Sequence, residues 1–173
     1  MENWFMITMF GKDQLGVVAK LSAALCKSGC NLGDSSMARL GSNFTIMIMV
    51  QHTGSVDDLE NVVKPIASEL SFRAHVDKVE GELEHHVEPD VRINIYTSER
   101  KGIVEEVTNE LGRAGLNILH LESNIGSLEN CPTYFIHMEG MATKGVDALY
   151  EALEVLSEEK DMNTQLIPHN VGH

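Results

Sequence analysis

A repeat with a fixed offset constrains the fold of this 173-residue chain more than any other feature. The stretch from Ile7 to Leu32 recurs 86 residues later, from Ile93 to Ile118. The matched positions include an acidic residue, two glycines and an asparagine, namely Asp13 with Glu99, Gly16 with Gly102, Gly29 with Gly115 and Asn31 with Asn117. One offset held over this length predicts two copies of one small unit, each with the same strand-to-helix corner.

The first copy, called unit one, alternates between strand and helix patterns. Asp13 is expected to cap the first helix, and Gly29 is expected to be left-handed just past its end. Pro65 is expected to kink the second helix or to mark a short first turn. In order, the expected elements are a strand over residues 3–10, a helix carrying Val17, Leu21, Ala24 and Leu25, strands over 31–40 and 44–50, a helix carrying Leu59, Val62, Val63, Ile66 and Leu70, and a strand over 72–79.

The second copy, called unit two, repeats this order. Its expected elements are strand 91–96, helix 101–114, strands 117–127 and 133–139, helix 146–160 and strand 162–167. Beyond the second strand the offset grows to 90, so that Phe44 falls on Tyr134 and Phe72 on Met162. Four additional residues are therefore expected in the second hairpin, near residues 124–132.

This βαββαβ order predicts an α+β fold made of two ferredoxin-like units. Each unit is expected to be a four-stranded antiparallel sheet with two helices on one face. The polar, proline-ended stretch 81–89 is expected to be a linker between a domain over residues 1–80 and a domain over residues 90–173.

The strands of the two units differ on the face that points away from the helices. Phe5, Ile7, Met9, Phe44, Ile46 and Ile48 are expected to face the helices, as are Val91, Ile93, Ile95, Tyr134, Ile136 and Met138. The opposite face of unit two is mostly polar. In unit one it consists of Met6, Thr8, Phe10, Thr45, Met47 and Met49. This apolar face is therefore predicted to be an interface, buried against the other unit or another subunit.

The charge of the chain argues against direct binding to nucleic acid. The net charge is −13, with 7 basic and 9 acidic residues in 1–80 and 6 and 17 in 81–173. Such a field repels phosphates. The longest apolar run, residues 46–50, is too short to span a membrane. Three cysteines that form no CxxC pair and an N-terminus without a basic region predict a cytoplasmic protein without a secretory signal.

Each corner places unpaired backbone amides at the start of a helix, where the helix dipole favours anions such as the carboxylate of an amino acid. Gly16 and Gly102 let a ligand or another backbone approach closely. Asn31 and Asn117 are expected beside the corners, and Asp13 or Glu99 is a candidate partner for an ammonium group. The alternative is purely structural, with Asp13 as a helix cap, the glycines as spacers and Asn31 as a turn residue.

The stretch Gly11-Lys12-Asp13-Gln14-Leu15-Gly16-Val17-Val18, followed by a helix and Gly29-Cys30-Asn31-Leu32, resembles an ACT domain, a βαββαβ module that senses small ligands. The second copy matches more loosely. Thr97 replaces Gly11, and Arg100 and Lys101 replace Gln14 and Leu15. By motif position the implied binding residues are Gly11, Asp13, Gln14, Leu15, Gly16, Asn31 and Leu32, and in unit two Glu99, Arg100, Gly102, Asn117 and Ile118. The resemblance places ligand sites at interfaces between ACT units.

The resemblance implies a non-catalytic sensor of a small amino acid, with glycine among the candidates. It implies a homodimer that acts on transcription through a protein partner, such as a transcriptional activator, without binding DNA itself. Two other hypotheses remain, a regulatory subunit of an amino-acid or one-carbon metabolic enzyme and a small-molecule enzyme on this frame. No catalytic motif, cofactor site or membrane segment is expected, and His85-His86 is a weak metal candidate.

Overall fold

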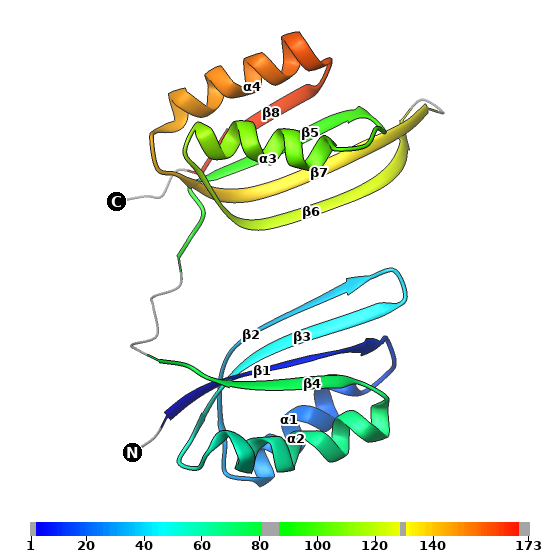
Figure 1. Cartoon of the computed structure of the whole chain (residues 1–173), viewed down its shortest axis with the longest axis vertical. Coiled ribbons are helices and arrows are strands. Elements are labelled where there is room, and N and C mark those ends of the chain that lie inside the picture. The colour runs from blue at the N-terminus through cyan, green and yellow to red at the C-terminus, as the bar shows by residue number, and fades with distance from the viewer. Residues whose placement is uncertain (1–2, 81–86, 129–130, 170–173) are drawn as a thin grey trace. The chain divides into compact units, whose positions relative to one another are not determined.

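The computed structural model describes residues 3–80, 87–128 and 131–169. The chain divides into two compact units, residues 1–83 and 84–173, which correspond to units one and two and are described separately (Figure 1). The assignment of residues 81–89 as a linker stays a prediction. The candidate metal pair His85-His86 lies outside the described residues.

Unit one is a four-stranded antiparallel sheet with strand order β2-β3-β1-β4 and both helices on one face (Figure 1). Because β1 and β2 both run antiparallel to β3, they run in the same direction, and helix α1 returns the chain from the end of β1 to the start of β2. The elements are β1 (Asn3–Lys12), α1 (Val17–Lys27), β2 (Asn31–Leu40), β3 (Asn43–His52), α2 (Val56–Leu70) and β4 (Arg73–Lys78).

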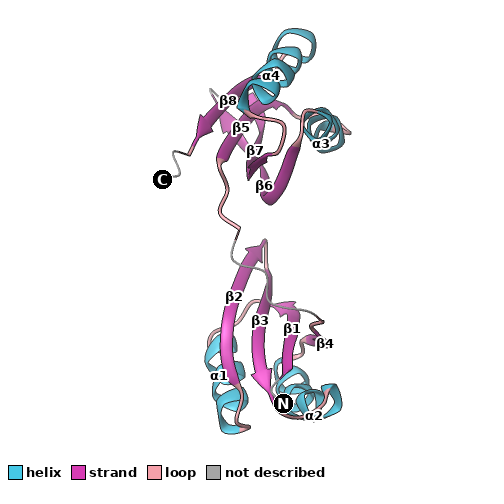
Figure 2. Ribbon diagram, turned by 90° about the vertical axis from the view of Figure 1, so that its left-hand side faces the viewer, coloured by secondary structure: helices cyan, strands magenta, loops and turns pink. Residues whose placement is uncertain are grey.

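Unit two has the same topology, with strand order β6-β7-β5-β8 (Figure 2). Its elements are β5 (Val91–Ser98), α3 (Ile103–Arg113), β6 (Leu116–Leu128), β7 (Cys131–Ala142), α4 (Val146–Lys160) and β8 (Asn163–Pro168). Strands β6 and β7 contain 13 and 12 residues, against 10 each in β2 and β3. The additional residues of the second hairpin therefore lengthen its strands. The predicted fold class, with two helices on one face of each sheet, is confirmed.

The cores form between each sheet and its helices, and they confirm the predicted inward faces. Alternate residues of β1, such as Phe5, Ile7 and Met9, are at most 1% exposed, as period-two packing requires. In unit two Val91, Ile93 and Ile95 are fully buried in the same way. Each core is a separate cluster of buried side chains, which is consistent with two repeats that each bury one apolar face.

Asp13 does not cap α1, contrary to the prediction, because the N-cap residue is Gly16 in the left-handed conformation, with no side-chain capping bond. Pro65 does not mark a short first turn, since α2 runs from Val56 to Leu70 with Pro65 inside it. A capping box between Ser55 and Asp58 fixes its start instead. The alternative expectation, a kink at Pro65, stays a prediction. Gly29 has φ +77° just past α1, as predicted.

Candidate functional site

The corner of unit one begins where β1 leaves the sheet at Lys12 and ends where α1 starts at Val17. Gly16 has φ +86°, a conformation that side chains with a Cβ rarely adopt, yet a Cβ built there meets nothing within 4 Å. The glycine is therefore required by backbone conformation and not by a close neighbour. Because no side chain caps α1, its first amide groups remain available, and the helix dipole favours an anion beside them.

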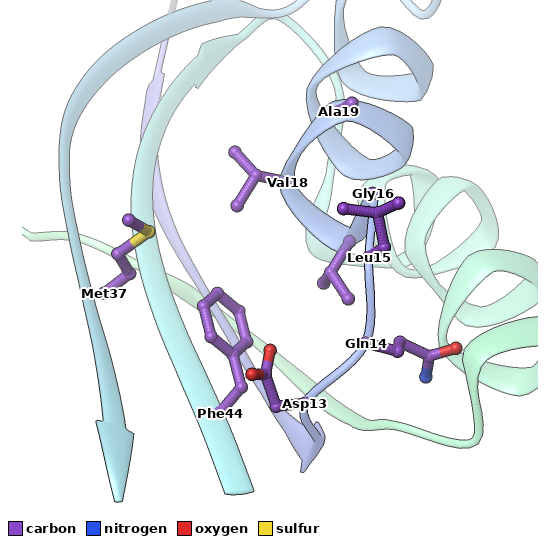
Figure 3. Close-up of a pocket in the computed structure, with 9 residues that line it drawn as sticks. Asp13, Gln14, Leu15, Gly16, Val18, Ala19, Met37 and Phe44 are labelled. Atoms are coloured by element: carbon purple, nitrogen blue, oxygen red, sulfur yellow. The ribbon is translucent and has the colours of Figure 1, made fainter.

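A cavity of about 490 Å³ lies against this corner and is partly open to solvent. The corner backbone and the first turn of α1 form one wall, and side chains of β2 and β3 form the other (Figure 3). The lining residues are Asp13, Gln14, Leu15, Gly16, Val17, Val18, Ala19, Met37 and Phe44. The predicted residues Asp13, Gln14, Leu15 and Gly16 thus lie together around one cavity, next to five apolar residues, three from the start of α1 and one each from β2 and β3.

The polar side chains of the corner have defined partners. The Gln14 side chain points away from Phe44 and Met37 (Figure 3), and its Nε2 donates a hydrogen bond of 2.7 Å to the Leu70 carbonyl. Gln14 therefore anchors the corner to the end of α2. Asp13 donates its backbone amide to the Ser42 carbonyl (2.9 Å), and its carboxylate forms an ion pair with Arg39 on β2. Leu15 is fully exposed.

Gly11 has a packing role. A Cβ at this position would lie 2.6 Å from the Phe72 ring, so the ring rests directly on the glycine. Phe72 in turn makes an edge-to-face contact with Phe44, with 6.3 Å between ring centroids. Gly11 does not line the cavity itself. It packs against the Phe72 ring, which in turn contacts Phe44 in the cavity wall.

The expectation that Asn31 lies beside the corner is wrong within one unit. Asn31 is opposite Gln51, which is opposite Trp4 near the start of β1, whereas the corner follows Lys12 at its end. Along β1, eight residues, or about 26 Å, separate Trp4, which is level with Asn31, from Lys12, which is level with the corner. Leu32 is next to Asn31 at the same far end.

The same geometry applies to Asn117 and Ile118. Asn117 is opposite Met141, whereas Ser98 at the corner end of β5 is opposite Thr133. In each unit, therefore, the corner and the asparagine that begins the second strand lie at opposite ends of the sheet.

The corner of unit two repeats the backbone and changes the side chains. Gly102 has φ +85° and no side chain caps α3. The cavity here is smaller, about 220 Å³, and is lined by Glu99, Arg100, Lys101, Gly102, Ile103, Val104, Glu105 and Tyr134. The Tyr134 hydroxyl donates a hydrogen bond of 3.2 Å to the Ser123 hydroxyl. These two residues correspond to Phe44 and Met37, which are apolar in unit one.

Ion pairs fasten this second corner. Arg100 bonds to one carboxylate oxygen of Glu106, and Lys160 lies 3.0 Å from the other. The Arg100 bond, followed by the Lys160 bond, holds the pKa of the Glu106 carboxyl below its ordinary value. Lys160 corresponds to Leu70, so both corners are tied to the end of the second helix, by a hydrogen bond in unit one and by charges in unit two.

The outward face of the first sheet has the apolar character that the sequence predicted. Phe10 is 47% and Met47 43% exposed, and Met6, Thr8, Thr45 and Met49 are half-buried. On the same face of unit two, His137 Nδ1–H donates a 2.7 Å hydrogen bond to Asn94 Oδ1, and Arg92 donates two bonds to Glu139. The Arg92 bond lowers the pKa of the Glu139 carboxyl. That the unit-one face is an interface stays a prediction.

Other chemistry has little support in the described part of the chain. No group of three or more His, Cys, Asp or Glu side chains there is arranged to hold a metal ion. Burial raises the pKa of the Cys30 thiol, with a smaller contribution from Cys26, and this opposes thiolate formation. No helix among the described residues is long and apolar enough to cross a membrane.

Sequence reasoning missed Met37 and Arg39 as neighbours of the corner. A β-bulge between Leu32 and Ser35 shifts the alternation of β2, so that Met37 and Arg39 stand opposite Ile46 and Phe44 on the helix side. Counting in twos from Leu32 without the bulge assigns them to the other face. The Gly33-Asp34 dipeptide is the only local signal of the irregularity.

Comparisons with known proteins agree with the fold of the two units. A family model for the ACT domain matches residues 3–83. The UPF0237 protein lin0537 of Listeria innocua is 30% identical over 78 residues, which cover 43% of this chain and 88% of that protein. The glycine cleavage system transcriptional repressor of Escherichia coli is 22% identical over 139 residues, covering 80% of this chain and 73% of that protein.

Among solved structures, an unknown protein from Galdieria sulphuraria matches with a TM-score of 0.78 at 21% identity, covering 98% of this chain and 99% of that one. At this identity the match establishes the fold alone. Together with the duplicated corner and the two identical topologies, the comparisons identify what the chain is: it belongs to the ACT-domain family and carries two copies of the fold in tandem.

Proposed function

We propose that this protein is a non-catalytic regulator that binds a small amino acid at the corner of unit one. The observation that carries the proposal is the cavity of about 490 Å³ at the uncapped start of α1. Its volume falls within the range of about 300–1,000 Å³ that is usual for small-molecule sites. Amide groups at one wall suit a carboxylate, and Val18, Met37 and Phe44 suit an apolar side chain.

A second copy of the chain is proposed to complete this site. Strand β2 is an edge strand whose residues are almost all exposed, and its Met37, like Leu15 and Val18 of the corner and α1, is an exposed apolar side chain. Two β2 strands placed side by side and antiparallel bring the start of one to the level of the end of the other. The partner's Asn31 then lies at the end of the sheet where the corner lies, which no residue 31 can reach within its own unit.

The proposed output is control of transcription through a protein partner. The Escherichia coli relative is named a transcriptional repressor of the glycine cleavage system, so glycine is one candidate ligand. A net charge of −13 disfavours direct contact with DNA, and a partner regulator that binds DNA avoids this repulsion. Coupling requires only that the ligand binds one arrangement of the two copies more tightly than another.

The test uses the full chain and the twenty standard amino acids. Thermal shift should identify at least one that raises the melting temperature, and calorimetry should give its affinity. Sedimentation with and without that amino acid should show whether it changes the association of the chain. If none of the twenty binds, the proposed function is wrong.

A matched pair of variants assigns the site. Gly16→Val and Gly102→Val put the same β-branched residue at φ +86° and +85°, with nothing within 4 Å of the new Cβ in either unit. Both variants should lose a similar amount of stability. Only Gly16→Val should abolish amino-acid binding, and an equal effect of the two on binding would contradict the assignment to unit one.

A further inference from the structure

One ion pair stands at the rim of the unit-one cavity. Arg39 Nε lies 3.0 Å from Asp13 Oδ2, and the Arg39 side chain is 68% exposed. Asp13 lines the cavity, and Arg39 stands directly opposite Phe44, which lines it as well. The two charges therefore come from different elements, the corner loop and the edge strand, and meet where the cavity opens.

From this geometry we propose that Arg39 binds the α-carboxylate of the amino acid while Asp13 binds its α-ammonium group. The proposal rests on the proposed function and names the residues that bind the two charged groups of the ligand. A guanidinium and a carboxylate side by side present the two opposite charges that an amino-acid zwitterion carries on adjacent atoms. Binding exchanges one protein ion pair for two pairs between protein and ligand.

The exchange is favourable because of where the pair lies. An exposed ion pair contributes little to stability, so separating Asp13 from Arg39 costs little. Arg39 uses its Nε on Asp13, and the guanidinium carries further donors in a planar fork that suits a carboxylate. Closure of the cavity by a second copy removes water from the new ion pairs and strengthens them.

Unit two retains only half of this arrangement. Glu99 replaces Asp13, but Ile125 stands opposite Tyr134 where Arg39 stands opposite Phe44. Of the cations near that corner, Arg100 and Lys160 are both bonded to Glu106, and Lys101 belongs to the corner itself and not to the edge strand. The edge strand of the second unit therefore has no cation at the position of Arg39 to bind a carboxylate. Recognition of the zwitterion is accordingly proposed for unit one alone.

Calorimetry on the full chain tests the proposal with three forms of each probe. The probes are the twenty amino acids and, for each one that binds, its carboxamide and its N-acetyl derivative. The carboxamide lacks the negative charge, and the N-acetyl derivative lacks the positive charge. The unaltered protein should bind the free amino acid about 10-fold or more tightly than either derivative, since each charged hydrogen bond is strong.

The variants separate recognition from a structural role. Arg39→Gln should weaken binding of the free amino acid about 10-fold or more and leave the carboxamide nearly unchanged, so that the preference between them disappears. Asp13→Asn should remove the preference over the N-acetyl derivative in the same way. Arg39→Lys should retain part of the preference because the charge remains. Lys12→Gln, which removes an exposed cation next to Asp13, is the control and should change neither preference.

The outcomes are distinct. If Arg39→Gln weakens the amino acid and its carboxamide equally, Arg39 only holds the corner in place and the proposal is wrong. If Arg39→Gln changes no affinity, the proposal is also wrong, while the proposed function stands. If no amino acid binds the unaltered protein, the proposed function fails, and the proposal fails with it.

Discussion

The two corners of this chain share a backbone and differ in almost every side chain around it. Both place a left-handed glycine before an uncapped helix, with φ +86° at Gly16 and +85° at Gly102. The cavity at the first is about 490 Å³ and has apolar walls, whereas that at the second is about 220 Å³ and has charged residues around it. The backbone conformation has thus been retained in both copies while the space beside it has not.

This difference separates what the fold requires from what a ligand requires. A left-handed glycine serves the turn from the first strand into the first helix in both units, so its presence says little about binding. Open space, apolar walls and an ion pair at the rim are not needed for folding, and they occur together in unit one. The corner of unit two is instead fastened by the bonds of Arg100 and Lys160 to Glu106.

Among the substitutions that test the difference between the two units, the largest loss of stability is expected at Gly11. Gly11→Thr places a Cβ 2.6 Å from the Phe72 ring, and overpacking of this kind costs about 1–3 kcal/mol of unfolding free energy. At the corresponding positions unit two has Thr97 together with Met162 in place of Phe72, and both side chains are buried. Urea unfolding followed by the fluorescence of Trp4, the only tryptophan, should report the loss in unit one.

The control for this prediction is a compensating change. Phe72→Met should recover part of the stability of Gly11→Thr, because it recreates the combination found in unit two. The double variant should therefore be more stable than the sum of the single changes predicts. If Gly11→Thr leaves the urea midpoint unchanged, the close packing of the ring on the glycine is not a constraint.

The elements of the fold were predictable because their signals are local and repeated. Alternation in residues 5–9 and 91–95 gave the inward faces, and one offset gave the topology of both units. The start of α1 was not predictable from Asp13, because an acidic residue before a helix pattern is a common cap and nothing in the sequence signals its ion pair with Arg39.

The site was less predictable than the fold for two physical reasons. The bulge after Leu32 changes which residues of β2 face the corner, and Met37 and Arg39 were missed for that reason. The distance between Asn31 and the corner follows from strand directions, which a motif does not encode. The corner residues and Asn31 of the motif can therefore belong to one site only if Asn31 comes from a second copy of the chain.

A smaller effect is expected from the outward faces of the two sheets. Met47→Glu puts a charge on the apolar face of unit one at a position that is 43% exposed, so it should cost little folding stability. If this face is an interface, as the sequence predicts, burying the new charge should weaken the assembly about 10-fold or more. Sedimentation velocity over a concentration series measures the change.

The matched control adds the same charge to unit two. Asn163→Glu lies on the outward face of the second sheet, opposite Tyr96, and is exposed. It should leave association unchanged, because the polar bonds on that face already satisfy its side chains without a cover. Equal effects of the two variants would show that added charge alone, and not the apolar face, controls assembly.

The smallest effect distinguishes the two units by their response to acid. The bonds from Arg100 and Lys160 lower the pKa of Glu106 below its ordinary 4.5, so ionised Glu106 stabilises the folded state above that pH. This stabilisation is lost as the pH falls through the lowered pKa. In unit one the bonds from the Ser55 backbone amide and hydroxyl lower the pKa of Asp58 with the same sign.

Salt separates these two contributions. High salt, about 1 M, screens the ion pairs of Glu106 but affects the hydrogen bonds that the Asp58 carboxylate accepts from Ser55 much less. Glu106→Gln should therefore remove a salt-sensitive part of the acid response from the circular dichroism of the whole chain and leave the acid response of Trp4 fluorescence in unit one unchanged. A shift in the Trp4 transition would mean that the two units do not unfold independently. The ion pairs of Glu106 in unit two would then also affect the stability of unit one.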